Sequence, residues 1–289
     1  PPPISTLFPY TTLFRSRIKN KWEQIESGVI TKSVQTTVPS LFETAQSSRC
    51  AAWRPYFNQA PTAQSQYYEG YNGCVPLAVS QIMKYFKYPL IGTGTGTGWN
   101  NGSYFTQNIN SFFDYSQMPF RLTYCGNGTN NCNDGSFDII PGVTQPQIDE
   151  IGKIQYNAGL AVGMRWIGMG NSNTYTGTTG DPEDWVLGMA NHFYYTSPTS
   201  SDYWSESEIS GNTSGFKTGL RNSLNIGYPI LFRYNQNGGG HAVVIDGYEN
   251  DEFFHFAVGR GGAEDAYYYL FSSDNDGVHL PRPYINLFG

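Results

Sequence analysis

The chain is poor in charged side chains, which make up 14% of its 289 residues, against about 25% in an average soluble protein. Its formal net charge is −6, and no run of Lys or Arg resembles a nucleic-acid-binding stripe. No apolar stretch approaches the roughly 20 residues that a membrane-spanning helix needs. We therefore expect neither nucleic acid nor a membrane among its partners.

Cysteine and histidine are also scarce, with four residues of each. The spacing of the cysteines fits no common zinc pattern, so we expect no metal, and no motif implies an organic cofactor. Cys125 and Cys132 enclose a short loop rich in Asn and Gly. This spacing leaves two interpretations open, a small disulfide formed in an oxidising compartment or two free thiols.

Aromatic residues and glycine are abundant instead, with 22 Tyr, 16% aromatics and 33 Gly. This composition is typical of β-structure with long polar loops and of exported proteins. We therefore expect a secreted or cell-surface protein.

Hydrophobic periodicity predicts helices in the first part of the chain and strands in the last. Apolar residues at helical spacing predict helices over 74–87, 145–158, 181–192 and 213–224. Apolar and aromatic runs predict strands over 228–234, 242–245, 252–258 and 267–271. The low-complexity stretch GTGTGTG before Trp99 is expected to be a loop. This order of elements indicates an α+β fold.

Cys74 follows Gly73 and opens the best-defined predicted helix. A thiol at a helix N-terminus lies at the positive end of the helix dipole and near unpaired backbone N–H groups, which favour the reactive thiolate. The same N–H groups could bind an oxyanion. The alternative is a buried cysteine that acts as a small hydrophobic residue.

His241 follows three glycines and leads directly into a predicted strand. Glycines let the backbone bend sharply and keep side chains away from whatever approaches the imidazole, which suits the edge of a cleft. The alternative is a glycine-rich hairpin end with an incidental histidine. The other histidines have no partner pattern, and we interpret each as structural: His192, His255 and His279.

Two long motifs carry these residues. Residues 73–85 read GCVPLAVSQIMKY and residues 239–248 read GGHAVVIDGY. They resemble GCVATAxAQIMKY and GGHAFVIDGY of the streptopain family of papain-like cysteine peptidases, and weaker matches lie between them in the family's order. The resemblance implies a papain-like α+β fold of two lobes, in which a helical lobe carries the Cys and an antiparallel β lobe carries the His.

The resemblance also implies a cysteine-type endopeptidase, with Cys74 as the nucleophile and His241 as the general base and then the general acid. The Cys74 N–H would donate to the oxyanion. The substrate-binding residues implied in the same way are Gly170, Asn171, Ser172, Gly239 and Gly240. The implied partners are a peptide or protein substrate and the chain's own pro-segment, acting as an intramolecular inhibitor.

The expected domain plan has three parts. Thr6–Ser16, TLFPYTTLFRS, matches a translated sequencing adapter, so residues 1–16 are excluded from the predicted fold. Residues 17–48 are expected to be a linker or the remnant of a pro-segment. The papain-like peptidase domain is expected over residues 49–289, with its C-terminal limit left open.

The family pattern is broken at two places. After the His-bearing strand the family reads HVNWGWGG, whereas residues 255–262 read HFAVGRGG, so that Ala257 replaces the Asn that orients the catalytic His and Val258 replaces a shielding Trp. Ala52 stands near the place of the family's oxyanion-donating Gln, with Gln46 and Gln59 as alternative donors. Losing an orienting group costs about 10⁴-fold in a serine protease, and losing an oxyanion donor about 10²–10³-fold. We expect a much reduced activity unless a nearby group substitutes.

Two other functions stay open. A catalytically silent homologue that binds peptides or a partner protein would explain the change at Ala257. A surface glycan-binding module is the more remote alternative, motivated by the aromatic and polar stretch that contains Trp99, Asn100, Asn101 and Tyr104.

Overall fold

In a computed structural model, Thr37–Gly289 form one compact unit. Within this unit the structure describes residues 37–44, 73–100, 102–119, 123–125, 137–139, 141–167, 175–178, 182–196, 209, 211–236, 239–250, 252–259, 265–270 and 283–284. The predicted adapter segment, 1–16, lies outside the described residues.

The described helices include all four that the sequence predicts. Their bounds are α2 (Leu41–Thr44), α3 (Cys74–Phe86), α4 (Gln145–Ala161), α5 (Pro182–Phe193) and α7 (Thr213–Asn225). Helix α4 starts where Thr144 and Gln147 form a capping box, which pairs backbone N–H groups left open at a helix start. It extends three residues beyond its predicted end because its buried residues continue to Ala161.

The described strands form two main sheets and a separate pair. The antiparallel sheet runs in the order β11–β10–β9–β8–β12, with β1 also paired to β9. Its strands are β1 (Thr37–Val38), β8 (Ile230–Gln236), β9 (Gly239–Glu249), β10 (Phe253–Ala257), β11 (Ala266–Tyr269) and β12 (Pro283–Tyr284). The second sheet, β3–β2–β6–β7, contains β2 (Thr95–Asn100), β3 (Ser103–Asn108), β6 (Met164–Ile167) and β7 (Tyr175–Thr178). The pair is β4 (Thr123–Cys125) with β5 (Phe137–Ile139).

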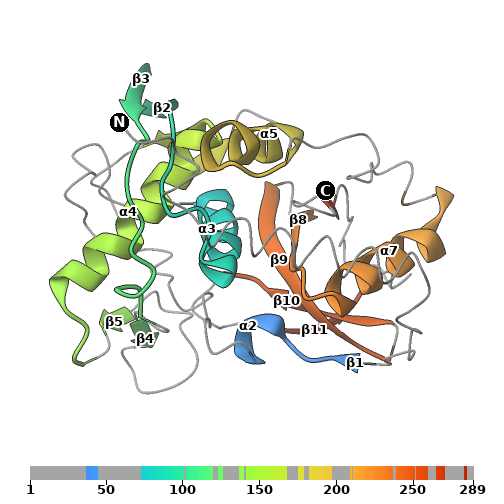
Figure 1. The fold of residues 1–289 in the computed structure, drawn as a ribbon. Coiled ribbons are helices and arrows are strands. Elements are labelled where there is room, and N and C mark those ends of the chain that lie inside the picture. Colours follow the sequence, from blue (N-terminus) through green and yellow to red (C-terminus); the bar gives the residue numbers. More distant parts are fainter. Residues whose placement is uncertain are drawn as a thin grey trace, which may run out of the picture. The chain divides into compact units, whose positions relative to one another are not determined.

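Helix α3 lies between α4 and the antiparallel sheet (Figure 1). Its residues from Val75 to Lys84 are all buried, because the helix contacts α4 on one side and β9 on another. The antiparallel sheet late in the chain and the helices before it confirm the predicted α+β class.

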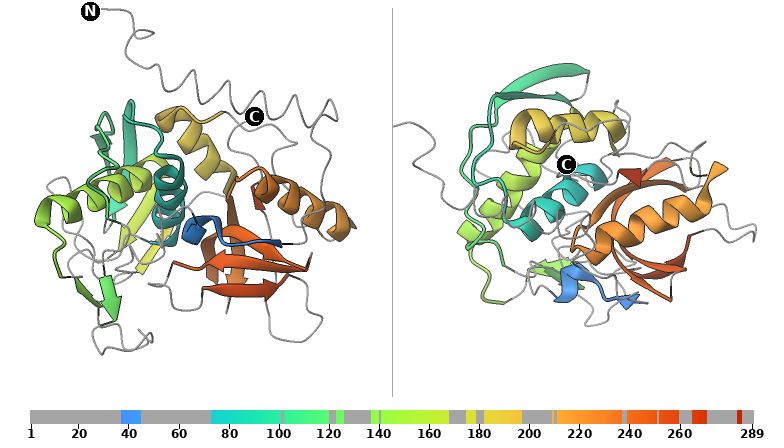
Figure 2. Two further views of the ribbon diagram at one scale, coloured as in Figure 1. Left: turned by 60° about the horizontal axis from the view of Figure 1, so that its bottom comes forward. Right: turned by 45° about the vertical axis from the view of Figure 1, so that its right-hand side comes forward.

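Two hydrophobic clusters occupy opposite faces of the antiparallel sheet. The larger cluster joins α3, α4 and α5 to alternate sheet residues, Leu231, Ala242 and Val244 among them. The smaller cluster joins α7 to the residues between them, such as Phe232 and Val243. Since successive strand residues point to opposite faces, α7 and α3 pack against different faces of the sheet. Figure 2 shows α7 lying along this sheet.

The prediction of a loop over GTGTGTG is wrong for residues 95–98, which belong to β2, between β3 and β6. Residues 92–94 precede the strand. Gly96 and Gly98 are buried and Thr97 between them is exposed. A Cβ at Gly96 would lie 2.7 Å from the Cβ of Leu160, and one at Gly98 would lie 2.7 Å from the Trp166 ring. Glycine therefore forms the inner face of this strand, where a search for alternating apolar residues finds nothing.

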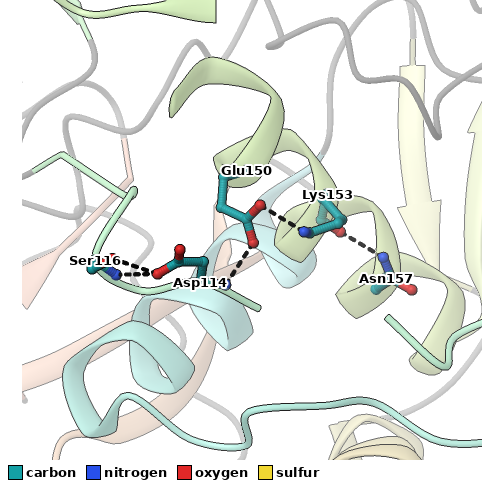
Figure 3. Close-up of polar contacts among 5 residues, drawn as sticks. All are labelled: Asp114, Ser116, Glu150, Lys153 and Asn157. Atoms are coloured by element: carbon teal, nitrogen blue, oxygen red, sulfur yellow. Dashed lines mark hydrogen bonds and ion pairs between the residues drawn. The ribbon is translucent and has the colours of Figure 1, made fainter. Parts of the chain in front are cut away.

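The loop after β3 is fixed by charged side chains from two helices. Lys84 on α3 is buried, and its Nζ donates to two loop carbonyls at 2.9 Å each, those of Tyr115 and Met118. Glu150 on α4 accepts from the Asp114 N–H at 2.7 Å and also pairs with a lysine on its own helix (Figure 3).

The segment 37–44 is joined to the antiparallel sheet by a buried carboxylate. Oδ2 of Asp246 accepts from the Ser40 hydroxyl and from the Phe42 N–H, and Oδ1 lies 2.6 Å from Nδ1 of His255. The domain limits stay a prediction, but these contacts connect part of the expected linker with the body of the chain.

Candidate active site

Cys74 is the first residue of α3 and is partly buried. Gly73 before it has φ 90, in the left-handed range that favours glycine. Among the described residues, no side chain caps this helix and no acidic residue lies in its first turn. The thiol therefore faces backbone N–H groups and the positive end of the dipole without a competing carboxylate.

His241 lies near the start of β9 and is 8% exposed. Helix α3 packs against β9, and this packing brings the His241 imidazole into hydrogen-bonding contact with the Cys74 thiol. The structure thus brings together the two residues that the motifs single out, although 166 positions (241 − 74 − 1) separate them in the chain.

The surroundings of Cys74 favour its thiolate. Burial raises the pKa of Cys74, whereas the charge of His241 and the hydrogen bond from its ring lower the pKa, as do the N–H groups of Ala242 and of Cys74 itself. The net effect is a pKa of Cys74 below its ordinary value of 9.0. A lower pKa increases the thiolate fraction at neutral pH, and the thiolate is the nucleophilic form.

A backbone carbonyl orients the imidazole. Nε2 of His241 lies 2.9 Å from the carbonyl oxygen of Val258. Because a carbonyl only accepts hydrogen bonds, Nε2 carries the proton, and Nδ1 is the nitrogen left to face the thiol. Ala257, which the motif resemblance aligns with the family's orienting Asn, is buried and has no polar side-chain atom. The backbone carbonyl of Val258, the next residue, therefore supplies the hydrogen-bond acceptor for Nε2 that the Ala257 side chain lacks.

Two contacts fix the backbone around Val258. Its N–H donates to Oδ1 of Asp265 at 2.8 Å. The following residue, Gly259, has φ 77, and a Cβ there would lie 2.8 Å from Cδ2 of Leu77 on α3. Sequence reasoning misses both Asp265 and the carbonyl, because every residue has a carbonyl and a single Asp after a glycine-rich loop has no distinctive spacing. The only available signal is that Asp side chains often bond to nearby backbone groups in loops.

The remaining predicted site residues fall into two groups. Gly239 and Gly240 begin β9 directly before His241, and Gly240 is exposed. The others lie outside the described residues: Gln46, Ala52, Gln59, Gly170, Asn171 and Ser172. The pairing of Cys125 with Cys132 also concerns side chains outside the described part of the chain, and stays a prediction.

The histidines interpreted as structural have backbone or carboxylate partners where they are described. His255 pairs with Asp246, the buried carboxylate that also binds the segment 37–44. Nδ1 of His192 lies 2.9 Å from the carbonyl oxygen of Thr93. His279 lies outside the described residues.

The Arg165 guanidinium lies 4.5 Å from the centroid of the Trp99 ring, so it covers a ring face that a sugar would need. Among the described residues, no group of three or more His, Cys, Asp or Glu could hold a metal ion. None of the described helices is both long and apolar enough to cross a membrane.

Known proteins resemble the chain over most of its length. The model of the peptidase C10 family matches residues 51–268. The thiol protease/hemagglutinin PrtT of Porphyromonas gingivalis is 25% identical over 210 residues, which are 70% of this chain and 20% of that protein. Streptopain of Streptococcus pyogenes is 27% identical over 209 residues, which are 68% of this chain and 45% of that protein. The match therefore spans less than half the length of either relative.

Two solved structures share the fold. A mutant fragment of prointerpain A from Prevotella intermedia superposes with a TM-score of 0.61 at 18% identity, over 96% of this chain and 83% of that one. The active wild-type interpain A cysteine protease of the same organism superposes with a TM-score of 0.57 at 18% identity, over 88% of this chain and 96% of that one. These likenesses confirm the predicted papain-like α+β fold. Since the family model spans both Cys74 and His241 and matches well over half of the sequence, the chain belongs to the peptidase C10 family.

Proposed function

We propose that this chain is a cysteine endopeptidase that cleaves peptides or proteins through an acyl-enzyme on Cys74. The observation that carries the proposal is the contact between the Cys74 thiol and His241, whose Nε2 is held at 2.9 Å by the Val258 carbonyl. A nucleophile, a base and a group that orients the base are the parts that acyl transfer to a thiol needs.

In the first half of the reaction, the Cys74 thiolate attacks the carbonyl carbon of the scissile peptide bond, and the carbonyl oxygen takes up negative charge. The N–H groups in the first turn of α3, that of Cys74 included, are available donors for this oxyanion. His241, protonated at both nitrogens once the thiol has ionised, gives the Nδ1 proton to the leaving amine. The products are an acyl-enzyme and a free amine.

In the second half, a water molecule transfers a proton to Nδ1 of His241 and attacks the thioester carbonyl. Collapse of the tetrahedral intermediate releases the acid and restores the thiolate and imidazolium. The Val258 carbonyl keeps the Nε2 proton bound throughout. The same nitrogen, Nδ1, therefore serves the thiol, the leaving amine and the water in turn.

The replacement of the family's Asn by Ala257 favours a silent homologue. The Val258 carbonyl opposes that alternative, because it offers an acceptor oxygen to Nε2 of His241 without any help from the side chain at 257. We therefore expect measurable peptidase activity.

We further propose that the protein is exported and is made with an inhibitory pro-segment. Low charge and abundant tyrosine and glycine support export. One of the matched structures is described as a fragment of prointerpain A, a proenzyme by its name. Residues 17–48 are the part of this chain to which we assign the inhibitory role.

The test is covalent trapping of the nucleophile. The folded full chain is treated with a peptidyl epoxide that alkylates the thiol of cysteine peptidases, and labelling is followed by intact mass. We expect one label, on Cys74, added at least about 10²-fold faster than to free cysteine, which is the lower range for a positioned acid–base group. Labelling should disappear in Cys74→Ser and fall to the free-thiol rate in His241→Ala.

His192→Ala is the matched control, because His192 is a partly buried histidine whose Nδ1 pairs with the Thr93 carbonyl, away from Cys74 in the sequence. This variant should keep the wild-type labelling rate. A folded wild-type protein that labels no faster than free cysteine would contradict the proposal and favour the silent homologue. Retention of the Cys74→Ser protein on a polysaccharide gel would favour the glycan-binding alternative.

A further inference from the structure

The orientation of His241 depends on backbone geometry. Its Nε2 donates to the carbonyl of Val258, and a carbonyl moves with the chain that carries it. The imidazole is therefore held only as firmly as the backbone around Val258. Whatever fixes that backbone determines how well His241 is aligned with Cys74.

Asp265 fixes this backbone from one side. Its Oδ1 accepts the Val258 N–H at 2.8 Å, and hydrogen bonds to carboxylates are about twice as strong as those between neutral groups. Asp265 directly precedes β11, which pairs with β10 starting from Ala266 opposite Phe256. The bond thus closes the base of the β10–β11 connection, immediately next to the carbonyl that holds His241.

Helix α3 fixes the same backbone from the other side. Gly259 packs so closely on Leu77 that an added Cβ would lie 2.8 Å from Cδ2. Leu77 lies one helical turn after Cys74 on the same helix. The segment that orients the base is therefore seated on the helix that presents the nucleophile.

We propose that Asp265 is a positioning residue for the peptidase reaction. Its carboxylate fixes the Val258 backbone, and the Val258 carbonyl in turn fixes the Nε2–H of His241. The inference rests on the proposed function of Cys74 and His241. In the family, an Asn side chain orients the catalytic imidazole directly. Here the Val258 carbonyl contacts the His241 ring, and the Asp265 carboxylate holds the Val258 backbone in place.

The kinetic test compares three variants at Asp265. Asp265→Ala removes the acceptor, and we expect kcat to fall about 10–100-fold, the usual effect of losing a group that orients a functional side chain. KM should change less than about threefold, because Asp265 acts through the Val258 backbone and His241. Asp265→Asn keeps an oxygen acceptor for the Val258 N–H and should retain kcat within about fivefold. Asp265→Glu, which displaces the carboxylate by one methylene, should give an intermediate loss and carries the test if the alanine variant fails to fold.

A second readout does not depend on turnover. Nitrogen-15 NMR of the His241 ring reports which nitrogen carries the proton and how fast that proton exchanges with solvent. We expect an Nε2–H signal with slow solvent exchange in the wild type, because the Val258 carbonyl accepts this proton, and faster exchange of the same proton in Asp265→Ala. Glu252→Ala is the matched control, because Glu252 lies at the β9–β10 turn and pairs with Lys217. This control should leave the ring signals unchanged.

The two proposals fail in distinguishable ways. A wild-type protein without turnover or epoxide labelling would overturn the proposed function, while the NMR comparison would still test the role of Asp265. An active wild type with unchanged kcat and unchanged ring signals in Asp265→Ala would overturn the positioning role alone. A fall in kcat with unchanged ring signals would also overturn it, as would an Asp265→Asn variant as slow as Asp265→Ala.

Discussion

At the residue scale, the arrangement depends on backbone atoms beside one histidine. The Val258 carbonyl fixes the proton on Nε2 of His241, and glycine at 259 lets the chain come close enough to Leu77 to hold that carbonyl in place. Neither feature depends on a reactive side chain. A search by residue type therefore finds the reacting pair and misses its support.

Gly259→Ala should weaken both the fold and the site. Its φ of 77 costs an alanine about 1–2 kcal/mol, and the contact with Leu77 adds about 1–3 kcal/mol of overpacking. We expect a lower free energy of unfolding by chemical denaturation and slower epoxide labelling of Cys74. Gly142→Ala is the matched control, since Gly142 has φ 92 but nothing within 4 Å of an added Cβ. Equal losses in the two variants would show that the contact with Leu77 is unimportant.

At the element scale, α3 connects the other elements of the site. It contacts α4 and β9, presents Cys74 at its start, and uses buried Lys84 near its end to bind the loop after β3. In this chain, the motif over residues 73–85 therefore contains a structural lysine as well as the proposed nucleophile.

Lys84→Met should destabilise the protein without changing the reacting pair. The carbonyls of Tyr115 and Met118 lose their donor at 2.9 Å, and an unsatisfied buried polar group costs about 1–3 kcal/mol. Denaturant titration should therefore show a loss in the free energy of unfolding of this order or larger. Lys87→Met, at an exposed position at the end of the same helix, should change it by less than about 0.5 kcal/mol. A neutral Lys84→Met would contradict the anchoring role.

The sequence allows the long helices and the late strands to be predicted, because apolar residues recur at helical spacing in the helices and form apolar and aromatic runs in the strands. It fails at β2, where Gly96 and Gly98 form the buried face and no apolar side chain marks it. At the site, motif resemblance identifies Cys74 and His241. Asp265 could not be identified in this way, because its role exists only once β10 and β11 have paired and brought it to the Val258 N–H.

At the scale of the whole unit, one buried carboxylate joins parts that are distant in the sequence. Asp246 is fully buried and bonds to Ser40, Phe42 and His255. Its charge also reaches α3, because burial together with Asp246 raises the pKa of Tyr85 to about 12. A shift in register between β9 and β10 at His255 accompanies this cluster.

Asp246→Asn should therefore loosen the segment 37–44 and destabilise the unit. Breaking a buried pair by changing one partner costs about 3–5 kcal/mol, which chemical denaturation can measure. Hydrogen exchange at the Phe42 N–H should become faster, because this group donates to the carboxylate. Asp184→Asn, at an exposed position on α5, is the matched control and should change neither quantity. Unchanged protection at Phe42 in Asp246→Asn would contradict the anchoring role.

The measurement that tests the account most directly is the ionisation of Cys74, followed by thiolate ultraviolet absorbance against pH, with Cys74→Ser subtracted as the background. The wild type should form thiolate with a pKa below 9.0. In His241→Ala the pKa should rise, because burial still raises it while the charge and the hydrogen bond of His241 are gone. A wild-type pKa at or above 9.0, or the same pKa in both proteins, would contradict a working Cys74–His241 pair.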